Sequence, residues 1–180
     1  VTTGNLTVTD EVKSTSTHAD SGNVLLQTVG GSITVLDDVS SKSGNITVLA
    51  SSDISIGQAA TAAIIKTEAT GKTVELEATA GGVTMQAESG LTTTNGAMRV
   101  MAATDVVVGK LNAGATSGVV SINAGGAITD ADADGGSQQV NVTASAVRFY
   151  GDDGVGTSAD DLELNVDTIA AKSVTSGGVY

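Results

Sequence analysis

The chain lacks proline, cysteine and tryptophan altogether, and it holds only three aromatic residues, Phe149, Tyr150 and Tyr180. Without cysteine there is no disulfide framework, no thiol catalysis and no cysteine-based zinc site. The absence of proline suits strands that pair on both edges, because proline cannot donate a hydrogen bond to a ladder. Because large aromatic groups are scarce, the core must be thin and consist of small, β-branched side chains.

Positive charge is also scarce. The chain carries 20 acidic but only 8 basic residues, which gives a formal net charge of −12. Such a surface repels phosphate backbones and anionic lipid headgroups, so no nucleic-acid partner is expected. No apolar run is long enough for a membrane-spanning helix, so no membrane insertion is expected, and no signal-peptide pattern opens the chain. The acidity is compatible with a secreted protein.

What the chain does contain is a recurring phrase of a small or hydroxyl residue, glycine, and then a short alternating apolar run. The phrase stands at 3–8, 21–26 and 43–48, with looser copies at 31–35, 82–85, 96–100 and 117–122. A period of about 20 residues is typical of solenoids, in which each repeat buries its apolar face only against its neighbours. The regular alternation of apolar residues argues against disorder.

Within the repeats, alternate residues are apolar, which predicts strands with one buried face. Val74, Leu76 and Ala78 share one face, whereas Glu75 and Glu77 share the other. The same alternation predicts inward pairs at Leu6/Val8, Ile33/Val35, Ile46/Val48, Ile54/Ile56, Val83/Met85, Met98/Val100, Val106/Val108, Val120/Ile122, Val140/Val142 and Leu162/Leu164. Glycine before a strand fits a corner where the backbone takes a positive φ.

We therefore predict an all-β fold, a right-handed parallel β-helix (β-solenoid) with roughly nine rungs of about 20 residues each. Residues 1–180 are expected to form a single β-solenoid segment that is a slice of a longer repetitive chain. The connections are short and polar, which excludes a βαβ design. The best candidate for a helix is 165–174, which is short and uncapped.

The phrase at 43–50, followed by 53–57, resembles the repeats of filamentous-haemagglutinin-like exoproteins of Gram-negative bacteria. The segments 74–78 and 81–84 are similar to the same repeats, and 154–160 and 176–180 are similar to another phrase of large repetitive adhesins. The resemblance implies a right-handed parallel β-helix, export across the outer membrane through a partner transporter, and a stalk or adhesive role at the cell surface. The secretion-domain motif of that family is not visible in this chain.

The sharpest local motif is the run of alternating carboxylates Asp130, Asp132 and Asp134, which ends in two glycines. This pattern resembles the start of a calcium loop, in which several oxygens converge on one hard cation. The twelfth position of such a loop is Asn141 instead of a glutamate, so any calcium site is expected to be weak. The competing interpretation is a polar turn between two rungs with solvated carboxylates. No other cofactor is expected.

Arg148, Phe149 and Tyr150 are the one place where aromatic and cationic groups cluster beside an acidic loop. Phe149 is expected to point into the core, and Arg148 and Tyr150 outward. Together with Asp152 and Asp153, the outward pair is our candidate contact surface, because arginine and tyrosine are enriched where proteins make contacts.

Two further groups of polar residues are of interest. The pairs Asp152/Asp153 and Asp160/Asp161 are the carboxylates that a polysaccharide-cleaving β-helix would use. The chain offers few cationic and aromatic groups to hold a sugar, so no enzymatic activity is expected. His18, the single histidine, lies among serines and threonines and is expected to be exposed.

Three N-x-T sequons begin at Asn5, Asn45 and Asn141. They permit glycosylation on a secreted protein, but two of them fall inside the repeated phrase, where asparagine also suits the corner. Asparagine side chains from successive rungs are also expected to stack into hydrogen-bonded ladders.

These observations predict a structural or adhesive β-solenoid segment of a large secreted or cell-surface protein, such as a stalk, an adhesin or an extracellular filament. The expected partners are neighbouring solenoid segments or copies end to end, and a glycan or protein on a host cell or neighbouring cell. The expected location is secreted, or on the exterior of the outer membrane. The alternative function is a polysaccharide-binding or polysaccharide-cleaving β-helix.

Overall fold

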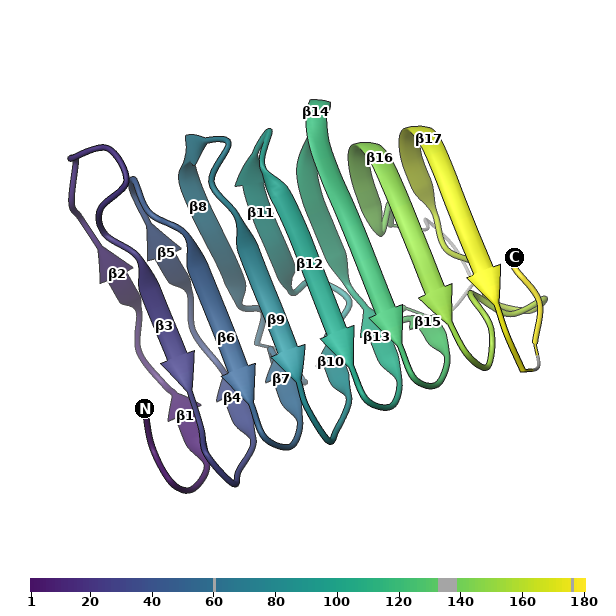
Figure 1. Ribbon diagram of the computed structural model, residues 1–180, viewed down its shortest axis with the longest axis horizontal. Coiled ribbons are helices and arrows are strands. Elements are labelled where there is room, and N and C mark those ends of the chain that lie inside the picture. Colours follow the sequence, from purple (N-terminus) through teal and green to yellow (C-terminus); the bar gives the residue numbers. More distant parts are fainter. Residues whose placement is uncertain (60, 133–138, 176) are drawn as a thin grey trace.

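Figure 1 shows the computed structural model of the chain, which describes residues 1–59, 61–132, 139–175 and 177–180. The described residues form one coil of parallel strands, about seven turns long, and none of them lies in a helix. The chain runs up the far side and down the near side as it advances from left to right, so the coil is right-handed. The predicted all-β, right-handed parallel β-solenoid is confirmed.

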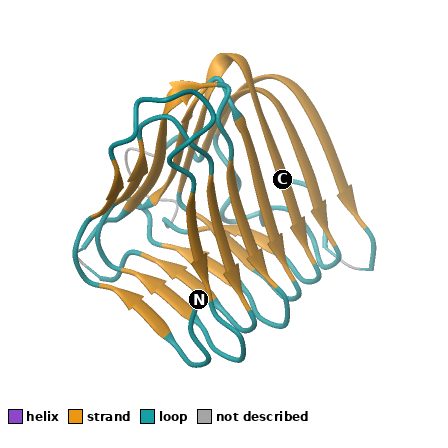
Figure 2. Cartoon of the chain, turned by 60° about the vertical axis from the view of Figure 1, so that its left-hand side comes forward, coloured by secondary structure: helices purple, strands orange, loops and turns teal. Residues whose placement is uncertain are grey.

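Each turn lays strands along three faces of a prism (Figure 2). The first face is a six-stranded sheet of β1 (Leu6–Val8), β4 (Ile33–Val35), β7 (Ile54–Ile56), β10 (Val83–Met85), β13 (Val106–Val108) and β15 (Ile128–Asp130). The second face contains β2 (Val12–Ser14), β5 (Val39–Ser41), β8 (Ile64–Thr70) and β11 (Gly90–Thr94). The third face contains β3 (Val24–Gln27), β6 (Ile46–Ala50), β9 (Val74–Ala78) and β12 (Ala97–Ala102). Three long strands cross from the second face to the third, namely β14 (Lys110–Ala124), β16 (Val142–Gly151) and β17 (Leu164–Ser173).

The turns are longer and fewer than the roughly nine rungs of about 20 residues that the repeat predicts. A turn takes 21 residues from Ile33 to Ile54, but 29 residues from Ile54 to Val83. The strands keep their register across this difference, so the extra residues lie in the connecting loops. The number of turns is therefore about seven.

The core consists of apolar columns in which each inward side chain lies between its counterparts in the turns before and after. Ile122, for example, is fully buried between Val100 and Phe149. Burial of such a side chain contributes about 1.5–3 kcal/mol. The predicted inward pairs are buried or half-buried with one exception: Val140, which precedes β16, is 46% exposed.

The segment 165–174 is strand and not helix. It lies almost wholly within β17, which pairs with β16 from Val142↔Leu164 to Gly151↔Ser173. The candidate helix is therefore not formed, because hydrogen bonds to the neighbouring turn outweigh a weak local helix propensity.

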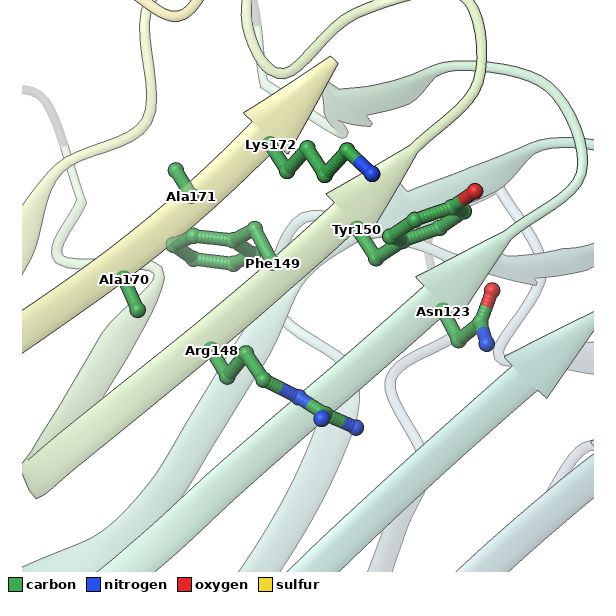
Figure 3. A pocket seen from close by; sticks show the side chains of 7 residues that line it. All are labelled: Asn123, Arg148, Phe149, Tyr150, Ala170, Ala171 and Lys172. Carbon is green, nitrogen blue, oxygen red and sulfur yellow. The ribbon is translucent and has the colours of Figure 1, made fainter. Parts of the chain in front are cut away.

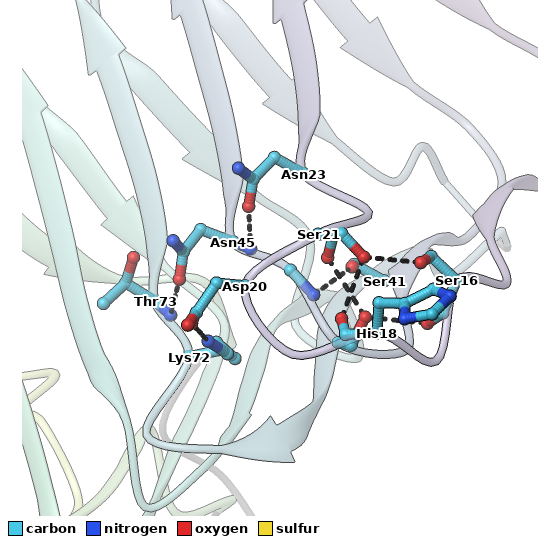
Figure 4. A network of polar contacts seen from close by, with 11 residues as sticks. Ser16, His18, Asp20, Ser21, Asn23, Ser41, Asn45, Lys72 and Thr73 are labelled. Atoms are coloured by element: carbon cyan, nitrogen blue, oxygen red, sulfur yellow. Dashed lines mark hydrogen bonds and ion pairs between the residues drawn. The ribbon is translucent and has the colours of Figure 1, made fainter.

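Corner side chains of one turn satisfy backbone donors of the next turn. Oδ1 of Asn23 accepts a hydrogen bond from the backbone N–H of Asn45 across 2.8 Å, and Oδ1 of Asn45 accepts one from Thr73 across 2.9 Å (Figure 4). Oδ1 of Asn5 accepts from Ser32 in the same way. The asparagines therefore connect successive turns through the backbone, which differs from the expected side-chain ladder.

Glycine at a corner is required by close stacking of the turns. A Cβ on Gly44 would lie 2.4 Å from the backbone nitrogen of Asn23, in the turn before, although the φ of Gly44 is not positive. The expected reason for glycine, a positive φ, holds at Gly22, whose φ is 78°. Both constraints explain why the phrase contains glycine.

Candidate metal centre and contact surface

Asp130 occupies a position that is apolar in the other turns. It is the last residue of β15, where it pairs with Val108 of the preceding turn, and its side chain is only 8% exposed. The last residues of the other first-face strands are Val8, Val35, Ile56, Met85 and Val108, all buried. A carboxylate thus replaces a hydrophobic side chain in this column. Buried charge costs several kcal/mol unless it is compensated.

Hydrogen bonds compensate one of the two carboxylate oxygens of Asp130. Its Oδ1 accepts from the backbone N–H of Asp132 across 3.1 Å and from Nδ2 of Asn141 across 2.6 Å. Its Oδ2 is buried and has no hydrogen-bond partner among the residues that the structure describes. Asn141 is itself 1% exposed, and its Oδ1 accepts from the backbone N–H of Glu163 across 2.8 Å. The asparagine therefore holds Asp130 and the Glu163 backbone in a fixed relation.

Three carboxyl groups meet at this point. Asp130, Asp132 and Glu163 each place one carboxylate oxygen within 4.8 Å of the others. Partial burial raises the pKa of Asp132, and the hydrogen-bonding contact and negative charge of Asp130 raise it further. Such mutual repulsion is what a bound cation would relieve. Within the described residues, this is the one group of three or more acidic or histidine side chains that is close enough to share a metal ion.

The predicted calcium motif is thus brought together in part. Asp130 and Asp132 lie side by side as the motif requires, whereas Asp134 lies outside the described residues. The sequence pattern missed Glu163, which stands one turn later, directly before β17. The only signal for it is the register that pairs Val142 with Leu164, and this register cannot be read from the motif.

The candidate contact surface surrounds a shallow hollow of about 350 Å³ near the C-terminal end of the third face (Figure 3). Alternate residues of β16 point in opposite directions, so Phe149 is buried whereas Arg148 is exposed and Tyr150 half-buried, as expected. Lys172 of the neighbouring β17 lines the same hollow, and its Nζ lies 5.4 Å from the centre of the Tyr150 ring. No pattern in the sequence marks Lys172, because only strand pairing places it beside Tyr150.

Two of the eight basic residues of this acidic chain, Arg148 and Lys172, line the hollow. In the described part of the chain neither Arg148 nor Lys172 forms a salt bridge; Arg148 makes a hydrogen bond to Oγ of Ser121 across 3.2 Å. The negative charge of Asp152 raises the pKa of Tyr150, and burial and a hydrogen bond with Asp152 add to the effect. The hollow therefore presents two cations and one neutral phenol.

The acidic residues next to the hollow also hold the turns together. The backbone N–H of Asp152 donates to the carbonyl of Ala124 across 3.2 Å, and its carbonyl accepts from Thr175 across 2.8 Å. The backbone N–H of Asp153 donates to Gly126 across 3.1 Å. Asp152 and Asp153 are thus the corner residues of the contact surface, and they do not line the hollow itself.

The acidic pair Asp160/Asp161 lies in a different loop from the pair Asp152/Asp153. Asp160 and Asp161 belong to the loop between Val155, on the first face, and β17. The backbone of Asp160 exchanges hydrogen bonds with that of Thr157 across 2.8 and 3.3 Å, which closes a tight turn. None of the four aspartates belongs to the acidic cluster found among the described residues.

The loop that contains His18 is held by its own polar residues (Figure 4). The hydroxyls of Ser16 and Ser21 are hydrogen-bonded across 2.6 Å, and Ser21 Oγ also donates to the carbonyl of His18 across 2.8 Å. Asp20, in the same loop, forms an ion pair with Lys72. His18 is exposed, as expected.

No helix in the described part of the chain is long and apolar enough to cross a membrane. Comparisons of the chain with protein-family models, with curated proteins and with solved structures give no match.

Proposed function

We propose that the chain is a structural and adhesive β-solenoid segment of a large secreted or cell-surface protein, of the kind its repeats resemble. The observation that carries the proposal is the continuous register of the first face. Leu6 pairs with Ile33, and the same column continues turn by turn to Val155 and Val179. Turns spaced about 4.8 Å apart give a stiff rod of roughly 30 Å, which suits a spacer.

The two ends of the rod favour neighbouring solenoid segments, or copies end to end, as partners. Ile169 of β17 continues a column of inward residues and is 51% exposed, whereas Val147, its neighbour in β16, is 3% exposed. At the other end Leu6 is only half-buried, whereas its partner Ile33 is fully buried. Open parallel edges and apolar ends of this kind accept a further turn.

The adhesive part of the proposal rests on the hollow lined by Arg148, Tyr150 and Lys172. An aromatic ring packs against the apolar face of a sugar, and the two cations without salt bridges pair with carboxylate or sulfate groups. An acidic glycan therefore fits this surface better than a neutral one. Its binding should weaken at high salt, because the surface is exposed.

The test is binding of the full chain, immobilised on beads, to a panel of acidic and neutral polysaccharides. We expect binding to the acidic members and a loss of about tenfold or more in R148A/K172A. K13A/K66A is the matched control, because it removes two lysines from elsewhere on the rod and should bind like the wild type.

Two results would count against the proposal. Binding to no member of the panel, or binding that R148A/K172A leaves intact, would remove the adhesive role from this surface. Release of reducing ends from a polysaccharide, lost in D152N/D153N, would replace the structural function by the polysaccharide-cleaving alternative.

A further inference from the structure

We infer that Asp130, Asp132 and Glu163 bind a hard divalent cation of the calcium class, which ties the sixth and seventh turns of the solenoid together. The inference goes beyond the proposed function and does not depend on it. It rests on the placement of one charge, on the chemistry of its neighbours and on the turns that those neighbours join.

Asp130 places a carboxylate inside an otherwise apolar column of the core. Its carboxylate is more than nine-tenths buried, in a column that valine, isoleucine and methionine occupy elsewhere. The hydrogen bonds from Asp132 and Asn141 both reach Oδ1, while the buried Oδ2 has no hydrogen-bond partner in the described ranges of the chain. A buried carboxylate oxygen in this state is destabilising unless a positive charge compensates it. No lysine or arginine makes a salt bridge with Asp130 among the described residues.

The donor set gives the class of cation. Asp130, Asp132 and Glu163 offer only carboxylate oxygens, which suit calcium and magnesium and not the nitrogen or sulfur preference of zinc. Calcium binds oxygens at about 2.3–2.6 Å, so two of its ligands lie at most about 5 Å apart. The separation of up to 4.8 Å among the three carboxylates falls within that limit. Magnesium demands a smaller and more regular octahedron, so calcium fits better.

The carboxylates that would bind the cation come from two successive turns of the solenoid. Asp130 ends β15 in the sixth turn, and Glu163 stands directly before β17 in the seventh. Asn141, directly before β16, already bridges these two segments by hydrogen bonds. A cation between the carboxylates would add a second link at the same place. Calcium binding should therefore stabilise the C-terminal turns in particular.

The experiment uses the full 180-residue chain after removal of metal with EDTA. Isothermal titration calorimetry with calcium chloride, and thermal unfolding with and without calcium, are compared for the wild type and for D132N/E163Q. The matched control is E68Q/D167N, which neutralises one exposed glutamate and one exposed aspartate elsewhere on the rod. Circular dichroism checks that each variant keeps its strands.

We expect one calcium per chain and a rise in Tm of about 5 °C when calcium exceeds its Kd a hundredfold. D132N/E163Q should lose both effects, and E68Q/D167N should keep them. Magnesium at the same concentration should shift Tm less. An equal calcium shift in all three proteins would assign the effect to general charge screening and overturn the inference. No heat of binding at millimolar calcium in the wild type would also overturn it.

Discussion

Nδ2 of Asn141 donates a hydrogen bond to Oδ1 of Asp130 across 2.6 Å, inside the solenoid. The same side chain accepts from the backbone N–H of Glu163 through its Oδ1. One amide therefore fixes the direction of a buried carboxylate and the path of the next turn. It leaves the negative charge of Asp130 in place, and this is the charge that the proposed cation would compensate.

Replacement of Asn141 by alanine should lower the free energy of unfolding by about 2–4 kcal/mol, because it leaves buried donors and acceptors without partners. Denaturant-induced unfolding, followed by circular dichroism, measures the effect. Asn165→Ala is the matched control: Asn165 is exposed on β17, and its loss should cost less than about 0.5 kcal/mol. Equal stabilities of the two variants would show that the amide has no structural role. Because Asn141 is 1% exposed in the folded chain, its side chain is not accessible for glycosylation at this sequon.

The columns of the core are tested at Ile122, which lies between Val100 and Phe149. Ile122→Asp places an unpaired charge in a narrow core and should destabilise the chain by several kcal/mol. Ile122→Val keeps the column apolar and should cost only about 0.5–1.5 kcal/mol. An unchanged Tm in the aspartate variant would contradict the core described above.

Close stacking at the corners separates two glycines that look alike in the sequence. A Cβ at Gly44 meets the backbone of Asn23 at 2.4 Å, whereas a Cβ at Gly4 meets nothing within 4 Å. Gly44→Ala should therefore push the turns apart and cost about 2 kcal/mol or more, while Gly4→Ala should change stability by less than about 0.5 kcal/mol. Thermal unfolding of the two variants decides the matter; similar melting temperatures would refute the steric explanation.

Asp132 gives a pH dependence of defined sign. Partial burial and Asp130, with a smaller effect of Glu88, raise its pKa above the ordinary value of 3.8. The folded chain then binds this proton more tightly than the unfolded chain does, so the contribution to stability is full below 3.8 and is lost as pH rises through the higher, folded pKa. In calcium-free buffer, the difference in stability between the wild type and D132N should thus shift in favour of the wild type on acidification from neutral pH. A difference that does not vary with pH would show that Asp132 titrates normally.

A carboxylate with the opposite shift provides the comparison for this titration. The hydrogen bond and positive charge of Lys72 lower the pKa of Asp20 below 3.8. Its contribution is therefore present above 3.8 and is lost at lower pH. Because Asp20 is exposed, this effect should be small and should vanish in high salt.

The sequence predicted the features that depend on alternation within one strand. Leu76 and Phe149 point inward and Arg148 outward, because neighbouring residues of a strand face opposite ways. It did not predict the features that depend on loop length. Turns of 21 and 29 residues keep the same strand register, so the number of turns does not follow from the length of the sequence repeat. For the same reason, the repeat does not predict that Asp130 and Glu163 lie close together.

The last prediction concerns association of the isolated chain through its ends. In the described part of the chain β17 pairs only with β16, so the backbone groups along its other edge have no neighbouring strand, and Ile169 is half exposed there. An open edge with an apolar column favours addition of another copy, and lysine at such an edge opposes it. We expect light scattering to show concentration-dependent oligomers that Ile169→Lys strongly reduces. Val119→Lys, on β14 in the middle of the rod and 44% exposed, adds the same charge away from the ends and should leave association unchanged. A strict monomer at hundreds of micromolar, with the first and last turns protected from hydrogen exchange, would show that the ends are closed and would defeat the proposal of end-to-end partners.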